Sequence, residues 1–479
     1  MARPTVALFA LLLGTYAYFY QAGGWNQNSR YDLVRAMVED QRLTIDRFEK
    51  NTGDDSIRNG HYYCDKAPGA SWLCTPSYAV MYWLAGSPAK PSATWLAWAV
   101  WLSIVLAIGV PSAIAAVFLA RLARALGLEG WRAYAVALAW AFATMALPYA
   151  TLLYGNQLAG ALLVIAFTLL VEIRQGARAT AVRLFAVGLC LGLAGATEYP
   201  AMLVVMPISL YGLVVVWRAA GWRPLVWAVL GGAIPLGALA LYHHVAFGSP
   251  GTFPYKYSVW KEPSTGVFMG IDAPKWPAFK GTFWGQHRGL LYIMPWFVLT
   301  VPGAIALGRR HLAEVLVAAW AVIAFVWLNV SIKPWHGGWA TGPRYLVPML
   351  PFAVVLGAGV LAWARAWPRA VQLSAGAVLA AMLAWSTAHM VAATAVKPEI
   401  SEKIKRPYTS VVWKHWWKGD LAISRQSIDM AGNPDRGPKQ AWNLGMKAGL
   451  GGQAAMIPLY LWWIFALGWL WRAARRPAA

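Results

Sequence analysis

Charged residues are scarce in this sequence of 479 amino acids. Asp, Glu, Lys and Arg together make up 13% of the chain, and only 19 residues are acidic. Because soluble globular proteins carry charge on roughly 25% of their residues, this composition argues against a soluble multidomain enzyme. The hydrophobic fraction of 59% also excludes a disordered chain, since disordered segments are poor in apolar residues.

Two kinds of site motif are missing as well. The chain has three cysteines, and no Cys/His spacing resembles a zinc site. Cys64 and Cys74 form either a disulfide or two buried thiols, and Cys190 lies inside an apolar run. No glycine-rich phosphate loop followed by Lys and Ser or Thr occurs, so the chain lacks that motif for binding a nucleotide.

Apolar runs of about 20 residues are what the chain has instead, and such runs predict transmembrane helices. We predict an all-α polytopic membrane protein, a single domain over 1–479 with about twelve spans. The predicted spans are Pro4–Ala22, Thr94–Ala120, Trp131–Tyr154, Gln157–Val171, Arg183–Thr197, Tyr199–Trp217, Leu225–Phe247, Leu290–Leu307, Leu312–Ile332, Tyr345–Ala364, Ala370–Ala393 and Met456–Trp471. The shorter apolar stretch Ser71–Ala85 is predicted to be a re-entrant or interfacial helix.

The loops predict the orientation of these spans. Short connections rich in Arg, such as those around Arg121, Arg178 and Arg309, all fall on one side, which should be cytoplasmic. An even number of spans then places both termini in the cytoplasm, and the first apolar segment is predicted to be a retained helix. We therefore expect a multi-pass protein of the bacterial inner membrane.

The opposite side receives every long segment, namely 23–93, 248–289, 333–344 and 394–455. Long segments in a compact membrane protein usually carry function. All lysines of the chain fall within them, together with most of the acids. A nucleic-acid-binding protein would concentrate its basic residues in one soluble domain, so the net charge of +22 does not predict that partner.

The first long segment contains two groups of candidate residues. Just after the first span, the spacing of apolar residues predicts an amphipathic interfacial helix with Asp32 in its first turn, and Arg30 in the same stretch is a candidate cation for the donor phosphate. Asp65 and Lys66 stand between aromatic residues and a Pro-Gly turn, where Lys66 could hold a lipid phosphate or simply pair with Asp65. The neighbouring Asp54 and Asp55 could bind a divalent metal ion, although adjacent acids in a polar loop are more often solvated.

Further candidates lie at the outer ends of later spans. Glu198 is an acid in a tight outer hairpin, and it is either a functional residue at membrane depth or a solvated one. The remaining candidates come from two outer loops rich in glycine and aromatic residues, and they are His287, Arg288, His336, Arg344 and Tyr345.

These residues suit sugar transfer from a polyprenyl phosphate. One carboxylate, from Asp32, Asp65 or Glu198, would accept the proton of the acceptor hydroxyl. Cations would stabilise the departing phosphate, with Arg binding it bidentately and Lys acting as a point charge. A lipid-linked donor would also explain how an enzyme without a nucleotide motif obtains an activated sugar.

The sequence resembles the bacterial membrane glycosyltransferases of the GT-C superfamily, which include the protein O-mannosyltransferases and the lipid A aminoarabinose transferase. The resemblance covers most of the chain and is carried by NQNSRYD (26–32), GHYYCDKAPG (60–69), TEYP (197–200), FGSP (247–250), RGLL (288–291) and WHGGWATGPRYL (335–346). It implies a large first outer loop with interfacial helices and a polyprenyl-phosphate-sugar donor. It also matches Lys66 to the lysine that binds the donor phosphate in the family.

The sequence departs from the family pattern at the acids. Where the family often has an Asp-Glu pair just before Arg-Tyr, this chain has Gln27 and Asn28, and the second family acid is matched by Asn156 at best. Two other functions therefore stay open, namely a transporter or flippase for an anionic lipid and a non-catalytic glycan-lipid binder. The acceptor, which could be a glycan, a lipid or a protein, is not specified by the sequence.

Overall fold

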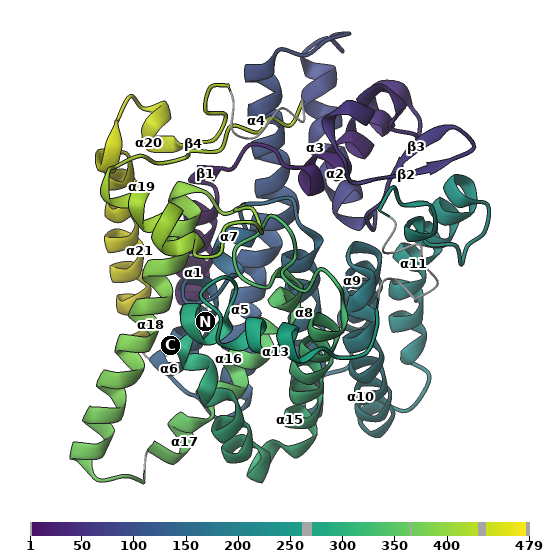
Figure 1. The fold of residues 1–479 in the computed structure, drawn as a ribbon. Helices are drawn as coiled ribbons and strands as arrows, with labels where there is room; N and C mark the ends of the chain where they lie inside the picture. Colours follow the sequence, from purple (N-terminus) through teal and green to yellow (C-terminus); the bar gives the residue numbers. More distant parts are fainter. Residues whose placement is uncertain (1, 261–270, 365, 430–436, 476–479) are drawn as a thin grey trace.

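The protein is almost entirely helical (Figure 1). The computed structural model describes residues 2–260, 271–364, 366–429 and 437–475. Its α-helices are α1 (Ala2–Tyr16), α2 (Trp25–Arg35), α3 (Gly69–Leu84), α4 (Ala93–Ile104), α5 (Val110–Ala125), α6 (Trp131–Phe142), α7 (Ala146–Tyr149), α8 (Gly155–Arg174), α9 (Ala181–Thr197), α10 (Met202–Ala220), α11 (Leu225–Phe247), α13 (Trp276–Phe283), α14 (Leu290–Ile293), α15 (Thr300–Ser331), α16 (Leu350–Ala358), α17 (Val360–Ala364), α18 (Arg369–Val396), α19 (Trp413–Trp417), α20 (Leu444–Lys447) and α21 (Ile457–Arg475). The short strands β1 (Phe19–Tyr20) and β4 (Trp442–Asn443) pair with each other, as do β2 (Asp55–Arg58) and β3 (His61–Cys64).

Within the described residues, eight helical runs are long and apolar enough to cross a membrane. They are Ala93–Ala125, Gly155–Arg174, Tyr199–Ala220, Leu225–Phe247, Pro295–Ser331, Arg344–Ala364, Arg369–Val396 and Gly452–Arg475. The apolar helix α9 adds a further run of 17 residues. The prediction of an all-α polytopic membrane protein is confirmed.

Several predicted spans end earlier in the structure than the sequence predicts, or are interrupted by non-helical backbone. The first is helical only to Tyr16, because the chain then forms β1, whose backbone groups bond to β4 near the other end of the sequence. The predicted span Trp131–Tyr154 is helical to Phe142 and then continues through the short α7 into irregular backbone. The run Pro295–Ser331 covers two predicted spans, which meet at a kink where His311 has φ −130° and ψ 47°.

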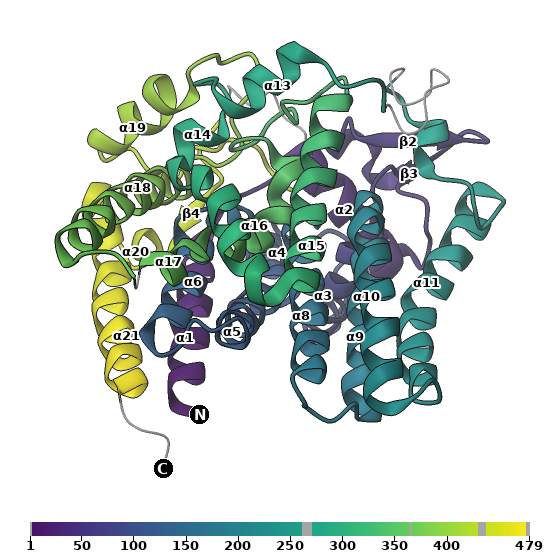
Figure 2. The same ribbon diagram turned by 90° about the horizontal axis from the view of Figure 1, so that it is seen from below.

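The segments outside the bundle gather at one end of it. Figure 2 shows the β2–β3 hairpin, α13 and α19 at the same end of the helices, although they come from three different long segments of the chain. The opposite end carries ion pairs between helices, such as Arg121 of α5 with Glu172 of α8 and Arg174 of α8 with Glu314 of α15. The two ends of the bundle therefore differ in the length of their loops, as the sequence predicts.

The helix after the first span is not the interfacial helix that the sequence predicts. α2 is buried on all of its faces from Asn26 to Arg35, including its polar residues. It packs against α3 and contacts β3 of the hairpin, which is why its polar side chains find partners inside the protein and not at a membrane surface. Asp32 accordingly sits in the third turn and not in the first.

Helices α9 and α11 pack with their backbones in contact at glycines. A Cβ atom on Gly188 would lie 1.8 Å from the carbonyl oxygen of Ala228, and one on Gly231 would lie 2.1 Å from that of Phe185. Small residues permit such close approach between membrane helices. This contact fixes the position of α9, whose end carries Glu198.

We expect Gly188→Leu to destabilise the protein by about 1–3 kcal/mol, because the added side chain must push α9 away from α11. Thermal unfolding in detergent, followed by tryptophan fluorescence, measures the effect. Gly237→Leu is the matched control, since a Cβ at this glycine of α11 meets nothing within 4 Å. Equal melting temperatures for the two variants would contradict the proposed close packing.

Candidate functional site

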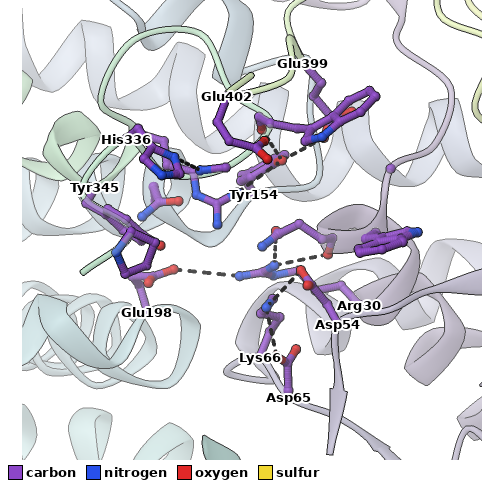
Figure 3. A pocket seen from close by; sticks show the side chains of 18 of the residues that line it. Arg30, Asp54, Asp65, Lys66, Tyr154, Glu198, His336, Tyr345, Glu399 and Glu402 are labelled. Carbon is purple, nitrogen blue, oxygen red and sulfur yellow. Dashed lines mark hydrogen bonds and ion pairs between the residues drawn. The ribbon is translucent and has the colours of Figure 1, made fainter. Parts of the chain in front are cut away.

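A large cavity of about 1930 Å³ lies where the outer segments meet the helical bundle. Residues from all four predicted outer segments line it, together with the ends of α9, α10, α11 and α15. Figure 3 shows its polar part, where Arg30, Lys66 and Glu198 surround the same space. The cavity therefore collects charged groups that are far apart in the sequence.

Arg30 reaches the cavity from the buried helix α2 and is only 3% exposed. Its Nη1 donates hydrogen bonds to the backbone oxygen and side-chain oxygen of Asn26, and its Nη2 lies 3.7 Å from Glu198 Oε2. The Nε of Arg30 is buried and has no hydrogen-bond partner within the described part of the chain. This guanidinium is thus held in place on one side and keeps donor capacity for a ligand.

Lys66 stands between two acids on the cavity wall. Its Nζ lies 2.9 Å from Asp65 Oδ2 and 3.0 Å from Asp54 Oδ2. Burial lowers the pKa of Lys66, but the two carboxylates outweigh it and raise that pKa above its ordinary value. Burial raises the pKa of Asp65, whereas the pull of Lys66 on Asp54 outweighs burial and lowers the pKa of that acid. Lys66 is consequently a permanent cation, and Asp54 is its partner rather than the solvated acid that the sequence predicts.

Arg344 opens the 3-10 turn Arg344–Met349 and faces the same space. Its Nη1 donates to the hydroxyl of Tyr154 at 3.4 Å, and its guanidinium lies 5.3 Å from the ring centroid of Tyr345. Gly337 has a φ of +75°, and a Cβ there would lie 2.8 Å from Cγ of Arg344. A glycine at position 337 thus gives the loop its left-handed turn and leaves room for the arginine side chain.

Glu399 is a cavity residue that the sequence does not single out. It follows α18 and is 4% exposed, and its Oε1 accepts a hydrogen bond of 2.6 Å from the hydroxyl of Tyr154. Its Oε2 accepts one of 2.7 Å from Nε2 of Gln27. Burial raises the pKa of Glu399 to about 7, although these two donors oppose the shift.

One wall of the cavity is apolar and lies within the bundle. It is built from residues of three helices, Met202, Leu203 and Met206 of α10, Leu236 and Leu239 of α11, and Leu328 of α15. Met202 is 37% and Met206 62% exposed, and both belong to a helical run that is long and apolar enough to cross a membrane. The cavity therefore joins an apolar surface to a group of cations.

The opposite part of the cavity is basic and aromatic. It is lined by Trp260, Trp339, Lys397, Lys403, Arg425 and Lys439. The Nζ of Lys397 lies 5.0 Å from the ring centroid of Trp339. Most of these residues belong to the segment 394–455, so this segment is part of the site and not a separate tail.

Most of the sequence-predicted site residues line this cavity. They are Arg30, Asp65, Lys66, Glu198, His336, Arg344 and Tyr345. Asp32, His287 and Arg288 do not line it. Asp32 is buried and accepts a hydrogen bond of 3.0 Å from Nδ2 of Asn51, and Arg288 donates to the backbone oxygens of Gly338, Ala340 and Ile400.

No group of three or more His, Cys, Asp or Glu side chains in the described ranges is arranged to hold a metal ion. Asp54 and Asp55, the pair weighed for a metal, point to different partners, since Asp54 binds Lys66 and Asp55 belongs to β2. Cys64 and Cys74 are two free buried thiols, which decides between the alternatives that the sequence leaves open.

Sequence reasoning missed Tyr154 and Glu399 for different reasons. Tyr154 looks like the end of a transmembrane helix, and only the break after Phe142 turns it into the cavity. Glu399 follows Lys397 and Pro398 directly after a predicted span, and a charged pair at that place is a signal that could have found it. Its proximity to Gln27, 372 positions earlier, is visible only in the fold.

Comparisons with protein-family models and with curated proteins find no match. Among solved structures, the chain is similar to ArnT from Cupriavidus metallidurans bound to undecaprenyl phosphate, at 17% identity and a TM-score of 0.46, over 98% of this chain and 76% of that one. The same protein in its apo state gives 18% identity and a TM-score of 0.47 over the same shares.

A second similar protein is the archaeal oligosaccharyltransferase AglB from Archaeoglobus fulgidus, in complex with an inhibitory peptide and a dolichol-phosphate. The identity is 11% and the TM-score 0.48, over 91% of this chain and 61% of that one. Both neighbours belong to the GT-C superfamily, the group that the sequence resembles. At these identities and TM-scores, the likeness assigns no activity to this chain.

Proposed function

We propose that this protein is a glycosyltransferase that moves a hexose or pentose from a polyprenyl-phosphate donor to an acceptor. The acceptor reacts at the extracytoplasmic face of a bacterial inner membrane, with both termini of the enzyme in the cytoplasm. The observation that carries the proposal is the cavity itself, which places Arg30, Lys66 and Arg344 beside an apolar wall of α10 and α11. A lipid phosphate needs cations for its phosphate group and an apolar surface for its hydrocarbon chain.

The cations would act on the leaving group. As the bond from the sugar to the phosphate breaks, negative charge grows on the phosphate oxygens, and fixed cations in a buried site stabilise this charge strongly. Arg30 and Arg344 offer planar donors for bidentate binding, and Lys66 offers a point charge. Polyprenyl phosphate is already a good leaving group, so these residues need not include a general acid.

The apolar wall would hold the prenyl chain. Met202 and Met206 are flexible side chains that adapt to irregular apolar ligands. The basic and aromatic part of the cavity, with Trp339 and Lys403, would receive the acceptor.

Binding of undecaprenyl phosphate to the purified protein tests the donor site. We expect Arg344→Ala to weaken this binding about 10- to 100-fold, since a charge-assisted hydrogen bond contributes about 1.5–3 kcal/mol. Arg344→Lys should recover part of the affinity, because lysine keeps the positive charge but lacks the planar guanidinium group that binds phosphate through two hydrogen bonds. Native mass spectrometry with the lipid in detergent gives the affinities.

Arg369→Ala is the matched control, since Arg369 is exposed at the start of α18 and lies outside the cavity. Unchanged affinity in Arg344→Ala would contradict the proposed donor site. Release of undecaprenyl phosphate from undecaprenyl-phosphate hexoses and pentoses in native membranes tests the transfer. Binding without consumption of any such donor would instead identify a non-catalytic binder or a flippase.

A further inference from the structure

The acids that line the cavity differ in what holds them. Asp54 and Asp65 are paired with Lys66, Glu198 lies 3.7 Å from Arg30, and Asp420 is paired with Lys439. A carboxylate paired with a cation is a weak proton acceptor, because the cation stabilises its charged form. Each of these four acids therefore already holds a cation, although burial outweighs the effect of Lys66 on Asp65 and raises the pKa of that acid.

Glu399 is held by neutral groups instead. Its two carboxylate oxygens accept one hydrogen bond each, from Gln27 Nε2 at 2.7 Å and from the Tyr154 hydroxyl at 2.6 Å. Each oxygen keeps a second lone pair for a further proton donor. Two charged groups also face it, Arg344 from the 3-10 turn and Lys397 from its own segment, and both favour its ionised form.

The orientation of Gln27 is determined by the backbone around it. Its side-chain oxygen accepts a hydrogen bond of 2.9 Å from the N–H of Leu153, so its Nε2 must be the group that faces Glu399. Gln27 is fully buried and cannot turn to solvent. Gln27 of the first segment thus holds an acid that comes from the segment after α18.

Gly24 leaves the space that the carboxylate occupies. A Cβ at this position would lie 2.7 Å from both Oε1 and Oε2 of Glu399. Gly24 has an extended backbone with φ 169°, a conformation open to any residue, so the carboxylate and not the backbone excludes a side chain here. The site is thus built around Glu399 from the first segment, the start of α8 and the C-terminal segment.

We infer that Glu399 is the catalytic base of the transfer, an inference that rests on the proposed function. It accepts the proton of the acceptor hydroxyl while the hydroxyl oxygen forms its bond to the anomeric carbon of the sugar. The bond from this carbon to the phosphate oxygen breaks, and its electron pair leaves with the polyprenyl phosphate, which Arg30, Lys66 and Arg344 hold. The pKa of about 7 lets Glu399 be ionised at neutral pH and still accept a proton readily.

The test compares variants in the donor-consumption assay, with undecaprenyl-phosphate hexose and pentose as probes and native membranes as the acceptor source. The wild type should lose kcat/KM as the pH falls below about 7, because protonated Glu399 is no base. Glu399→Gln should lower kcat about 100-fold or more and remove this acid limb, while undecaprenyl phosphate still binds. Glu129→Gln, which removes an exposed acid outside the cavity, is the control.

Two variants separate the base from a structural role. Tyr154→Phe removes a hydrogen bond that lowers the pKa of Glu399, so its acid limb should move to higher pH. Gly24→Ala should displace the carboxylate and lower kcat while binding of undecaprenyl phosphate persists. Neither effect is expected if Glu399 only supports the fold.

The outcomes distinguish the two proposals. An acid limb that persists in Glu399→Gln, or disappears instead in Glu402→Gln, overturns the assignment of Glu399 and leaves the transferase intact. Glu402 is a further acid of this segment that lines the cavity, and its buried Oε2 has no hydrogen-bond partner among the described residues. A wild type that consumes none of the donors overturns the proposed function, and the assignment of Glu399 falls with it.

Discussion

Replacement of Lys66 by methionine is expected to lower the rate of the proposed transfer by about 100- to 1000-fold, the effect of removing one charged donor to a developing oxyanion. Methionine keeps the length of the side chain but loses the ammonium group that lies within 3.0 Å of Asp54 and Asp65. The same change leaves the buried Asp65 and the partly exposed Asp54 close together without their cation, which also destabilises the fold. Consumption of undecaprenyl-phosphate sugars measures the first effect, and thermal unfolding measures the second.

The two effects separate in a variant that removes all three charges. Lys66→Met combined with Asp54→Asn and Asp65→Asn contains no unpaired acid in this cluster, so its melting temperature should return towards that of the wild type. Its transfer rate should stay low, because no cation replaces Lys66. Full activity in this triple variant would show that Lys66 serves only to neutralise the acids. The control is Lys90→Met, which changes an exposed lysine of the same segment.

Replacement of Arg288 by alanine is expected to lower the free energy of unfolding by about 3 kcal/mol or more. The guanidinium is buried, with 1% of the residue exposed, and it donates to the backbone oxygens of Gly338, Ala340 and Ile400. A buried carbonyl that loses its donor costs about 1–3 kcal/mol, and here three lose it at once. Arg288 therefore ties the loop 333–344 to the backbone next to Glu399.

Thermal unfolding in detergent tests this role, with Arg406→Ala at an exposed arginine as the control. The melting temperature of Arg288→Lys should lie between those of the wild type and Arg288→Ala, because an ammonium group cannot reach three carbonyls as the planar guanidinium group can. Arg288→Ala with the melting temperature of the wild type but without affinity for undecaprenyl phosphate would favour the role that the sequence suggests, direct binding of the donor phosphate.

The membrane helices could be predicted because a long run of apolar residues is by itself a signal that the segment is buried. Leu225–Phe247 is both the predicted span and the observed helix, and the turn at Glu198 separates α9 from α10 as predicted. The predicted span boundaries were wrong where a strand far away in the sequence forms hydrogen bonds with the backbone. Residues 19 and 20 leave the first helix because β4, more than 400 positions later, supplies their hydrogen bonds.

Helix α2 shows that prediction from the local sequence has the same limit at the candidate site. Its pattern of apolar residues is that of an amphipathic surface helix, yet its polar face is buried by α3 and by segments from the end of the chain. Asn28 illustrates the reason, since its Nδ2 donates to the backbone oxygens of Asn51 and Ser427. A pattern of polar residues shows that partners are needed but not whether water or protein provides them.

Composition and the distribution of charge were enough to determine a polytopic membrane protein whose polar segments lie on one side, because both depend on each stretch of the chain by itself. Lys66, Glu198 and Arg344 could be proposed as site residues for the same reason, since charge beside an apolar run is a local signal. The tertiary structure alone decided that Asp54 neutralises Lys66, that Arg288 binds backbone rather than lining the cavity, and that Glu399 faces Gln27. Each of these depends on the distance between residues far apart in the sequence, which only packing sets.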